Sequence, residues 1–370
     1  MMKTNQKILF LALNVFDSTG GIQKMCRTMA KVVNDLPNRN NQVLSLFDNL
    51  PDSNYIAPVK FRGFNGKRLR FTMHSMLAGR KASTIIISHV HLVAISVLIK
   101  LLNTQPRIIM IAHGTEVWRS LPVWKKWFIR KYVTVWAVSD YTKNRLHNLH
   151  RITRNVKTIH NSLDPFFEIP SSFQKPGHLL KKYNLNPDQP VLLTICRQNK
   201  HEHDKGYNQI IKTIPRLLED FPTLRYLLCG AIDEEEKARI MRIVIKNKLQ
   251  QYISLIGFID ERELTDHYLL ADSFILPSKK EGFGLVFIEA AACGCQIISG
   301  NADGSAEALL QGKLGTMVNS SNLEELYKII HQTLMQKQTF KDKKSIQRLS
   351  IQNFSFSSYQ KKIIAALSTY

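Results

Sequence analysis

The sequence has few of the residues that mark disordered, fibrous or disulfide-stapled chains. Among 370 residues there are 13 prolines, 17 glycines and five cysteines, whereas hydrophobic residues make up 44% and charged residues 22%. These values exclude a disordered chain and a collagen-like one. A chain of this length buries an ample core without metal or disulfide staples, and we expect it to form two domains.

The cysteines do not have the spacing of a zinc site or of a disulfide framework. They are odd in number, they form no CxxC pair, and all five lie in apolar runs. We interpret them as buried thiols of a protein in a reducing compartment. A redox pair formed by Cys293 and Cys295 is the alternative.

Long uninterrupted hydrophobic runs are also absent. Residues 84–102 nearly have the length of a membrane span, but polar residues interrupt them, among them Ser88, His89, His91 and Lys100. A buried strand over 84–88 followed by a buried helix over 91–102 is favoured over a membrane span, because central polar residues are costly in lipid. The amino-terminal residues have no signal-peptide cleavage site and favour a first β-strand, so we expect a cytoplasmic location.

Acidic residues are scarce in the first half of the chain. The formal net charge is +22, and residues 1–170 carry 25 basic and 8 acidic side chains, a net charge of +17. Such a field favours nucleic acid, an anionic membrane surface or a phosphorylated substrate. We do not expect nucleic acid, because no helix-turn-helix, RRM, KH or zinc pattern is present.

Two stretches of this half mix basic residues with apolar ones. Residues 60–81 hold seven Lys or Arg and no acid, and residues 118–132 hold five and no acid, with all four tryptophans in or just beyond the second stretch. This mixture is typical of a surface that contacts an anionic membrane, on the inner face of the cell membrane for a cytoplasmic protein. The alternative is that the aromatic residues belong to the core and the charges form a solvated face.

Apolar, β-branched runs alternate with helical periodicity along the chain. This alternation predicts two doubly wound α/β domains, since apolar strands between helices are typical of a parallel sheet covered on both faces. The predicted boundaries are a first domain over 1–165, a proline-rich linker over 166–189, a second domain over 190–352, and a helix within 353–370 that packs back on the first domain. Ligands of such sheets bind at the carboxyl ends of the strands.

The most informative motif lies in the second domain, where a strand ends near Leu276 and a helix starts near Leu285. The loop between them contains residues 281–284 (EGFG). Its glycines let backbone N–H groups approach an anion, and the helix dipole adds to the attraction, so the loop is suited to a diphosphate. Glu281 lies in this loop and Glu289 lies one to two turns into the helix, and we interpret these carboxylates as hydrogen-bond acceptors for sugar hydroxyls.

Three further strand-to-helix junctions carry glycine or polar residues. Arg197 and Lys205 follow another strand of the second domain, where they would neutralise a leaving diphosphate or simply form a solvated charged loop. In the first domain, Gly20 and Gly21 follow the first strand, and His113 stands at the carboxyl end of a later one. A histidine at that place is a better site candidate than one on a helix face.

Together these motifs resemble the retaining glycosyltransferases of family 4, which have the GT-B fold. Five features occur in the family's order: the GG loop, the His-Gly element, the Arg and Lys-Gly pair, EGFG with its second glutamate, and a G-x-x-E ending at Glu307. The last could also be a helix cap. The resemblance implies two Rossmann-like domains facing a central cleft. Asp303 departs from the family, which usually has a second glycine at this position.

The resemblance also implies a role for each site residue. The catalytic group would comprise His113, near the anomeric carbon, Arg197 and Lys205, which stabilise the diphosphate leaving group, and Glu281, which contacts the donor sugar. The donor-binding group would comprise Gly20, Gly21, Phe283, Gly284, Leu285 and Glu289, with Gly284 and Leu285 offering backbone N–H groups and Glu289 binding the ribose.

The function that the resemblance implies is sugar transfer with retention of anomeric configuration. A hexose-type sugar would move from a UDP- or GDP-sugar to a glycan or lipid-pyrophosphate-linked acceptor, without metal or cofactor, in the biosynthesis of a surface polysaccharide. Two alternatives stay open: a GT-B sugar-nucleotide epimerase, which needs no acceptor, and a non-enzymatic protein that binds polyanions or nucleic acid.

Overall fold

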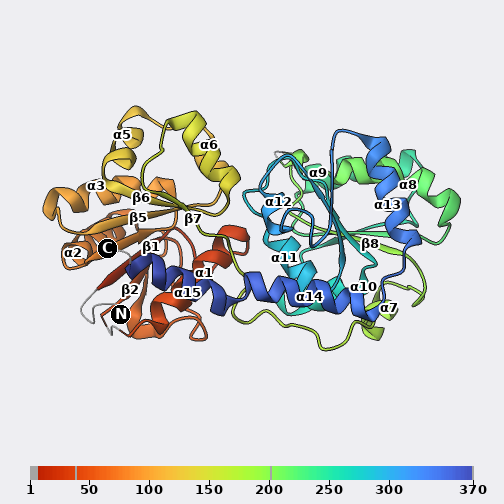
Figure 1. Cartoon of the computed structure of the whole chain (residues 1–370), viewed down its shortest axis with the longest axis horizontal. Coiled ribbons are helices and arrows are strands. Elements are labelled where there is room, and N and C mark those ends of the chain that lie inside the picture. The colour runs from red at the N-terminus through yellow and green to blue at the C-terminus, as the bar shows by residue number, and fades with distance from the viewer. Residues whose placement is uncertain (1–6, 38–39, 201, 369–370) are drawn as a thin grey trace. The chain divides into compact units, whose positions relative to one another are not determined.

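The computed structural model describes residues 7–37, 40–200 and 202–368 and divides into two compact units (Figure 1). Unit 1 comprises Met1–Pro165 and Phe354–Tyr370, and unit 2 comprises Phe166–Asn353. Each unit is built on one parallel β-sheet with helices between successive strands. The predicted doubly wound α/β class is confirmed in both units.

Unit 1 contains a seven-stranded sheet in the order β3-β2-β1-β4-β5-β6-β7. The direction of strand addition reverses between β1 and β4, as in other doubly wound sheets. The strands are β1 (Ile8–Ala12), β2 (Gln42–Ser45), β3 (Phe61–Gly63), β4 (Thr84–Ile87), β5 (Arg107–Ala112), β6 (Val133–Ala137) and β7 (Val156–Thr158). The central strands β1, β4 and β5 are almost entirely buried, which explains their uninterrupted apolar sequences.

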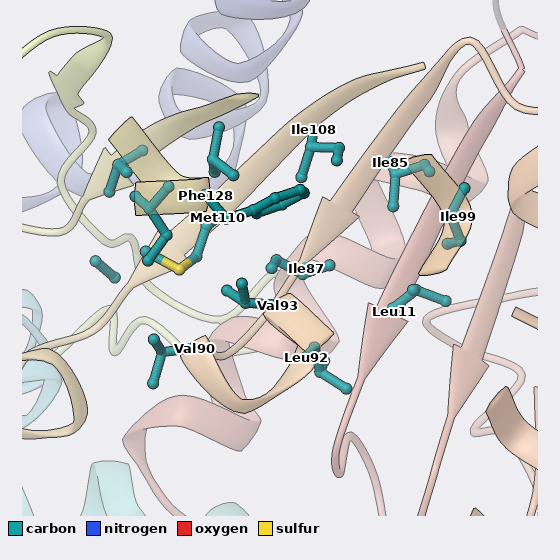
Figure 2. Packing of buried hydrophobic residues seen from close by; sticks show 14 of the residues in the cluster. Leu11, Ile85, Ile87, Val90, Leu92, Val93, Ile99, Ile108, Met110 and Phe128 are labelled. Atoms are coloured by element: carbon teal, nitrogen blue, oxygen red, sulfur yellow. The ribbon is translucent and has the colours of Figure 1, made fainter. Parts of the chain in front are cut away.

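One face of this sheet is covered by α2 (Arg68–Arg80), α3 (Val93–Leu102) and α5 (Val123–Tyr132). Figure 2 shows strand residues such as Ile85 and Met110 in one cluster with Ile99 of α3 and Phe128 of α5. The other helices of unit 1 include α1 (Gly21–Asp35), α4 (Thr115–Trp118), α6 (Asp140–His150) and α15 (Phe356–Ser368). Helix α15 packs beside α1, where Gln360 Nε2 donates to Asp35 Oδ2 at 3.3 Å.

Unit 2 contains a six-stranded sheet in the order β10-β9-β8-β11-β12-β13. The strands are β8 (Val191–Ile195), β9 (Arg225–Cys229), β10 (Ile253–Gly257), β11 (Ser273–Leu276), β12 (Gln296–Gly300) and β13 (Thr316–Val318). The helices are α7 (Gly177–Lys182), α8 (Tyr207–Asp220), α9 (Glu234–Lys246), α10 (Leu264–Leu270), α11 (Leu285–Ala292), α12 (Ser305–Ala308), α13 (Leu323–Met335) and α14 (Phe340–Phe354). The strand order reverses between β8 and β11, so the loops that follow these two strands are neighbours.

The ambiguous apolar segment 84–102 is resolved by the fold. It forms β4, a short 3-10 helix η2 (Val90–Leu92) and α3, close to the predicted strand and helix. Within the described ranges, no helix is both long and apolar enough to cross a membrane. The five cysteines are free thiols, four of them buried and Cys196 partly so. Burial raises the pKa of Cys295 to about 12, which disfavours the thiolate that redox chemistry needs.

Candidate active site

The candidate site of unit 2 lies at the carboxyl ends of β8 and β11, where the strand order reverses. The loop after β8 leads through a 3-10 helix η3 (His203–Lys205) to Gly206, and the loop after β11 starts at Pro277. Gly206 has φ +84°, and a Cβ at this position would lie 2.4 Å from the Pro277 carbonyl oxygen. Only glycine permits this close approach, which holds the two loops against each other.

Lys205 and Glu281 form an ion pair across these two loops. Lys205 Nζ lies 2.5 Å from Glu281 Oε1, and the side chains are 20% and 14% exposed. Burial lowers the pKa of Lys205, but the Glu281 carboxylate outweighs it and holds the pKa above its ordinary value. Lys205 is therefore a fixed cation at the edge of the sheet where doubly wound folds bind their ligands.

Asp303, in the loop after β12, fixes the backbone of Glu281. Its Oδ2 accepts the Glu281 backbone N–H at 2.7 Å and its Oδ1 accepts the Ser305 N–H at 3.0 Å. The N–H of Gly304 donates in return to the Glu281 carbonyl at 2.9 Å. Burial and the neighbouring Glu281 carboxylate raise the pKa of Asp303 to about 6. The residue that departs from the family pattern thus ties the loop after β12 to the loop that carries Glu281.

The start of α11 has the form of an anion site. Gly284 precedes the helix with φ +90°, Phe283 is buried beside it, and α11 begins at Leu285. No acidic residue lies in the first turn, and among the described residues no side chain caps this end. The first backbone N–H groups of such a helix attract negative charge.

Glu289 lies inside unit 2, one turn further along α11. The residue is 2% exposed, and its Oε2 accepts a hydrogen bond from the Tyr268 hydroxyl of α10 at 3.0 Å. A buried carboxylate needs such a donor to offset its desolvation. The structure therefore holds Glu289 in place through Tyr268, and its binding to a ribose stays a prediction.

Arg197 has a different environment from Lys205. Its side chain is 66% exposed, and its Nη2 lies 2.6 Å from Oε1 of Glu202 in the same loop. A second pair joins this loop to the one after β11, since Lys280 Nζ lies 2.6 Å from Asp204 Oδ2. Arg197 is thus free of the packing that fixes Lys205, and an incoming anion would compete with Glu202 for its guanidinium.

The glycine pair of unit 1 lies at the carboxyl end of β1. Gly20 has extended backbone and Gly21 opens α1; no acidic residue lies in the first helical turn, and no side chain of the described residues caps it. The preceding loop is held by the buried carboxylate of Asp48, which accepts the N–H groups of Val15, Phe16 and Asp17, each at 2.7 Å. The sequence did not single out Asp48, because nothing local marks it as the anchor of a loop 31 or more positions away.

His113 lies at the carboxyl end of β5 in unit 1. Its backbone N–H donates to Glu116 Oε1 at 2.5 Å, and Nε2 lies 3.1 Å from the Ser88 carbonyl oxygen. Burial, with a smaller contribution from His89, lowers the pKa of His113 to about 4. The ring is therefore neutral at pH 7, with the proton on Nε2 donated to Ser88 and Nδ1 left as an acceptor.

The structure thus brings Lys205 and Glu281 into direct contact and places Gly284 and Leu285 in the same loop and helix start. Gly20, Gly21 and His113 belong to unit 1, at the carboxyl edge of its own sheet. In the described part of the chain, no group of three or more His, Cys, Asp or Glu side chains could hold a metal ion. Metal independence itself stays a prediction.

Comparison with known proteins finds a family match in the second half of the chain. Residues 178–353 match the family model "Glycosyl transferases group 1". The matched region includes Arg197, Lys205, the EGFG loop, Glu289 and Asp303, and it lies almost wholly within unit 2.

Curated proteins resemble this chain at low sequence identity and over part of its length. The chain is 26% identical over 231 residues to a GDP-mannose-dependent alpha-(1-6)-phosphatidylinositol monomannoside mannosyltransferase of Mycolicibacterium smegmatis, covering 60% of this chain and 59% of that protein. It is 26% identical over 171 residues to the alpha-monoglucosyldiacylglycerol synthase of Acholeplasma laidlawii, covering 46% and 41% of the two chains. The chain therefore spans about three fifths of the length of the first relatives it matches.

Solved structures match over nearly the whole chain. Anabaena HepE in complex with UDP superimposes with a TM-score of 0.80 at 16% identity, covering 99% of this chain and all of that one. WaaG, described as a glycosyltransferase involved in lipopolysaccharide biosynthesis, gives 0.68 at 12% identity, covering 98% and 100%. Likeness at this identity shows the fold alone. The chain has the GT-B fold, as predicted.

Proposed function

We propose that this protein is a retaining, metal-independent glycosyltransferase that moves a hexose-type sugar from a UDP- or GDP-sugar to a glycan or lipid-linked acceptor. The observation that carries the proposal is the Lys205–Glu281 pair, 2.5 Å apart beside the start of α11. The fixed cation and the helix N-terminus match the diphosphate of a sugar nucleotide, and the carboxylate matches the hydroxyls of its sugar.

The chemistry assigned to these groups is stabilisation of the departing nucleoside diphosphate. As the bond between the anomeric carbon and the phosphate oxygen breaks, negative charge grows on that oxygen, and Lys205 offsets it without reorganising. Arg197 and the backbone N–H groups at the start of α11 add to this stabilisation. Glu281, whose backbone is fixed by Asp303, accepts hydrogen bonds from the sugar hydroxyls.

Retention follows from attack on the face that the diphosphate leaves. The acceptor oxygen forms the new bond to the anomeric carbon, and its proton passes to the departing phosphate oxygen, so the step balances without a protein nucleophile. Glu281 then forms no covalent bond to the sugar. Because the His113 ring is neutral and not cationic, its Nδ1 can accept a hydrogen bond from a sugar hydroxyl.

The acceptor class is proposed from the surface and from the relatives. Two relatives carry lipid-containing products or substrates in their names, a phosphatidylinositol mannoside and a glucosyldiacylglycerol. In unit 1, apolar side chains stand exposed on the three helices of one sheet face, among many Lys and Arg residues: Leu69, Met73 and Leu77 on α2, Leu98, Leu101 and Leu102 on α3, and Val123, Trp124 and Trp127 on α5. The exposure of Trp124 and Trp127 argues against the alternative that the aromatic residues of 118–132 are all core, although Phe128 is buried.

A transfer assay tests the proposal. The purified chain is incubated with UDP- and GDP-hexoses, with a chelator present, and with diacylglycerol or lipid-pyrophosphate glycans as acceptors. We expect release of one nucleoside diphosphate coupled to an acceptor product whose anomeric configuration, read by proton NMR, equals that of the donor. Lys205→Met should lose this activity and Lys212→Met, an exposed lysine on α8, should keep it. An inverted product would contradict the retaining mode, and an isomerised donor formed without acceptor would indicate an epimerase.

A further inference from the structure

A basic groove lies at the amino edge of the unit 1 sheet, opposite the edge that carries Gly20 and His113. It is a cavity of about 890 Å³ where β1, β2 and β3 begin and α2 ends. Its charged or titratable lining residues are Lys7, Lys60, Arg62, His74, Arg80 and Lys81. We call this cavity the amino-edge groove.

The charge in the amino-edge groove is of one sign. Five Lys or Arg residues line it, and no acidic residue is among its described lining residues. Burial and the charge of Lys81 lower the pKa of Lys7, so two of these cations repel each other at close range. Crowded like charges destabilise the fold unless a counter-charge offsets them.

Two of these cations contact neutral groups. Lys60 Nζ donates to the Asn34 carbonyl at 2.7 Å, and the Arg62 guanidinium lies 5.5 Å from the centre of the Phe64 ring. These contacts orient both cations without neutralising them, and an arginine over an aromatic ring keeps its N–H donors for a further partner. The negative end of the α2 dipole accounts for Arg80 and Lys81 but not for Lys7, Lys60 and Arg62, which lie outside α2.

The rim of the groove is apolar. Val59 is 88% exposed and Leu77 is 63% exposed, and both line the groove. From Leu77 the exposed apolar residues continue along α2 through Met73 to Leu69. A soluble phosphate compound would be matched by the cations alone, whereas a phosphate at a lipid surface is matched by cations and by an adjoining apolar strip.

We propose that the amino-edge groove is a binding site for the phosphate headgroup of an anionic membrane lipid, with Val59 and the exposed face of α2 against the lipid. The cations of Lys7, Arg62 and Lys81 then contact phosphate oxygens, and the apolar side chains at the rim enter the headgroup boundary. The groove belongs to unit 1 and involves none of the residues assigned to sugar transfer, so this proposal does not rest on the proposed function.

Co-sedimentation with vesicles tests the site. One set of vesicles contains phosphatidylcholine alone and the other adds phosphatidylglycerol. The test variant is Lys7→Gln/Arg62→Gln/Lys81→Gln, and the matched control removes three exposed charges elsewhere, Arg154→Gln/Lys212→Gln/Lys246→Gln. We expect the unchanged protein to bind only the anionic vesicles. The test variant should bind them about a hundredfold more weakly, since each basic residue near such a surface contributes about fivefold.

The control variant should bind the anionic vesicles nearly as well as the unchanged protein. Equal loss in test and control variants would overturn the site, because net charge alone would then explain binding. Unchanged binding by the test variant would overturn it as well. Titration with glycerol phosphate forms a second arm: binding to this soluble compound without binding to vesicles contradicts a lipid source. Stabilisation by nucleotide, measured on the test variant, separates loss of this site from misfolding and from failure of the proposed sugar transfer.

Discussion

Lys205 Nζ and Glu281 Oε1 lie 2.5 Å apart although 76 positions separate the two residues in the chain. The contact follows from the strand order, because β8 and β11 are neighbours at the point where the sheet reverses direction. Gly206 against Pro277 and Asp303 against the Glu281 N–H fix the two loops on either side of the pair. The pair is therefore built into the framework of unit 2.

Lys205→Met and Glu281→Gln should each lower the rate of sugar transfer by about 10²-fold or more, the scale of losing one preorganised contact to the transition state. The two effects should not add in the double variant, because each single change already leaves the other side chain without its partner. Steady-state kinetics of the two single variants and the double variant measure this coupling. Fully additive effects would mean that the pair does not act as a unit.

Asp303 should make the stability of unit 2 depend on pH. Its pKa is about 6 in the folded chain against an ordinary value of 3.8, so the folded chain binds the proton more tightly. Its contribution to the free energy of unfolding is therefore full below pH 3.8 and is lost as the pH rises to about 6. Relative to Asp303→Asn, which does not titrate, the protein should gain about 1 kcal/mol between about pH 7.5 and about pH 5.

Denaturant unfolding of both proteins at these two pH values measures the gain, and groups that titrate in both cancel in the difference. An identical difference in unfolding free energy at both pH values would show that Asp303 does not hold its proton as described.

Gly206 should tolerate no side chain. Gly206→Ala combines a left-handed backbone, which costs about 1–2 kcal/mol, with a clash against Pro277 of about 1–3 kcal/mol. Gly257→Ala has the same kind of backbone, φ +80°, with nothing within 4 Å, so it should show the first cost alone. Gly177→Ala, which meets nothing within 4 Å and opens α7, should be neutral or slightly stabilising. Thermal unfolding of the three variants ranks them, and equal losses for Gly206→Ala and Gly257→Ala would refute the close approach.

Arg197 should contribute to binding of the sugar nucleotide and little to the stability of the fold. Its pair with Glu202 is exposed on the arginine side, and such pairs contribute less than about 1 kcal/mol. We expect Arg197→Ala to keep the thermal midpoint of the unchanged protein but to weaken binding of a nucleoside diphosphate, more at low salt than at high salt. Calorimetric titration at two salt concentrations measures this. A lowered thermal midpoint with unchanged affinity for the nucleoside diphosphate would mean that Arg197 stabilises the fold and does not bind the donor.

The fold was largely predictable from the sequence because its strands are buried on both faces. Uninterrupted apolar runs such as 108–112 indicate this directly, and they lie within β5. The edge strands β3 and β13 were not predicted, since three residues with mixed burial give no period. Helix α7 lies within the segment predicted as linker, where prolines hide a short helix.

Site residues were predictable where a motif lies within one loop. They were not predictable where residues from loops far apart in the sequence contact each other. The EGFG loop is one continuous segment. Its Gly284 has the left-handed backbone that glycine favours, so the residue type itself indicates the conformation. Asp303 looked like a mere departure from the family, and its hydrogen bond to Glu281 appears only when β12 is placed beside β11. Asp48 and Tyr268 were missed for the same reason: each acts on a residue from another element.

The most direct test of the account is thermal stabilisation by sugar nucleotides in the presence of a chelator, measured on the unchanged protein, on Lys205→Met and on Lys212→Met. UDP-, GDP- and ADP-sugars are compared, and a ligand at about 100 times its Kd adds about 2.7 kcal/mol, which raises the midpoint by several degrees. The account predicts that one nucleotide class stabilises the unchanged protein and that Lys205→Met loses most of that shift while Lys212→Met keeps it. Equal stabilisation of all three proteins, or none of the unchanged protein by any sugar nucleotide, would contradict a donor site at Lys205 and Glu281.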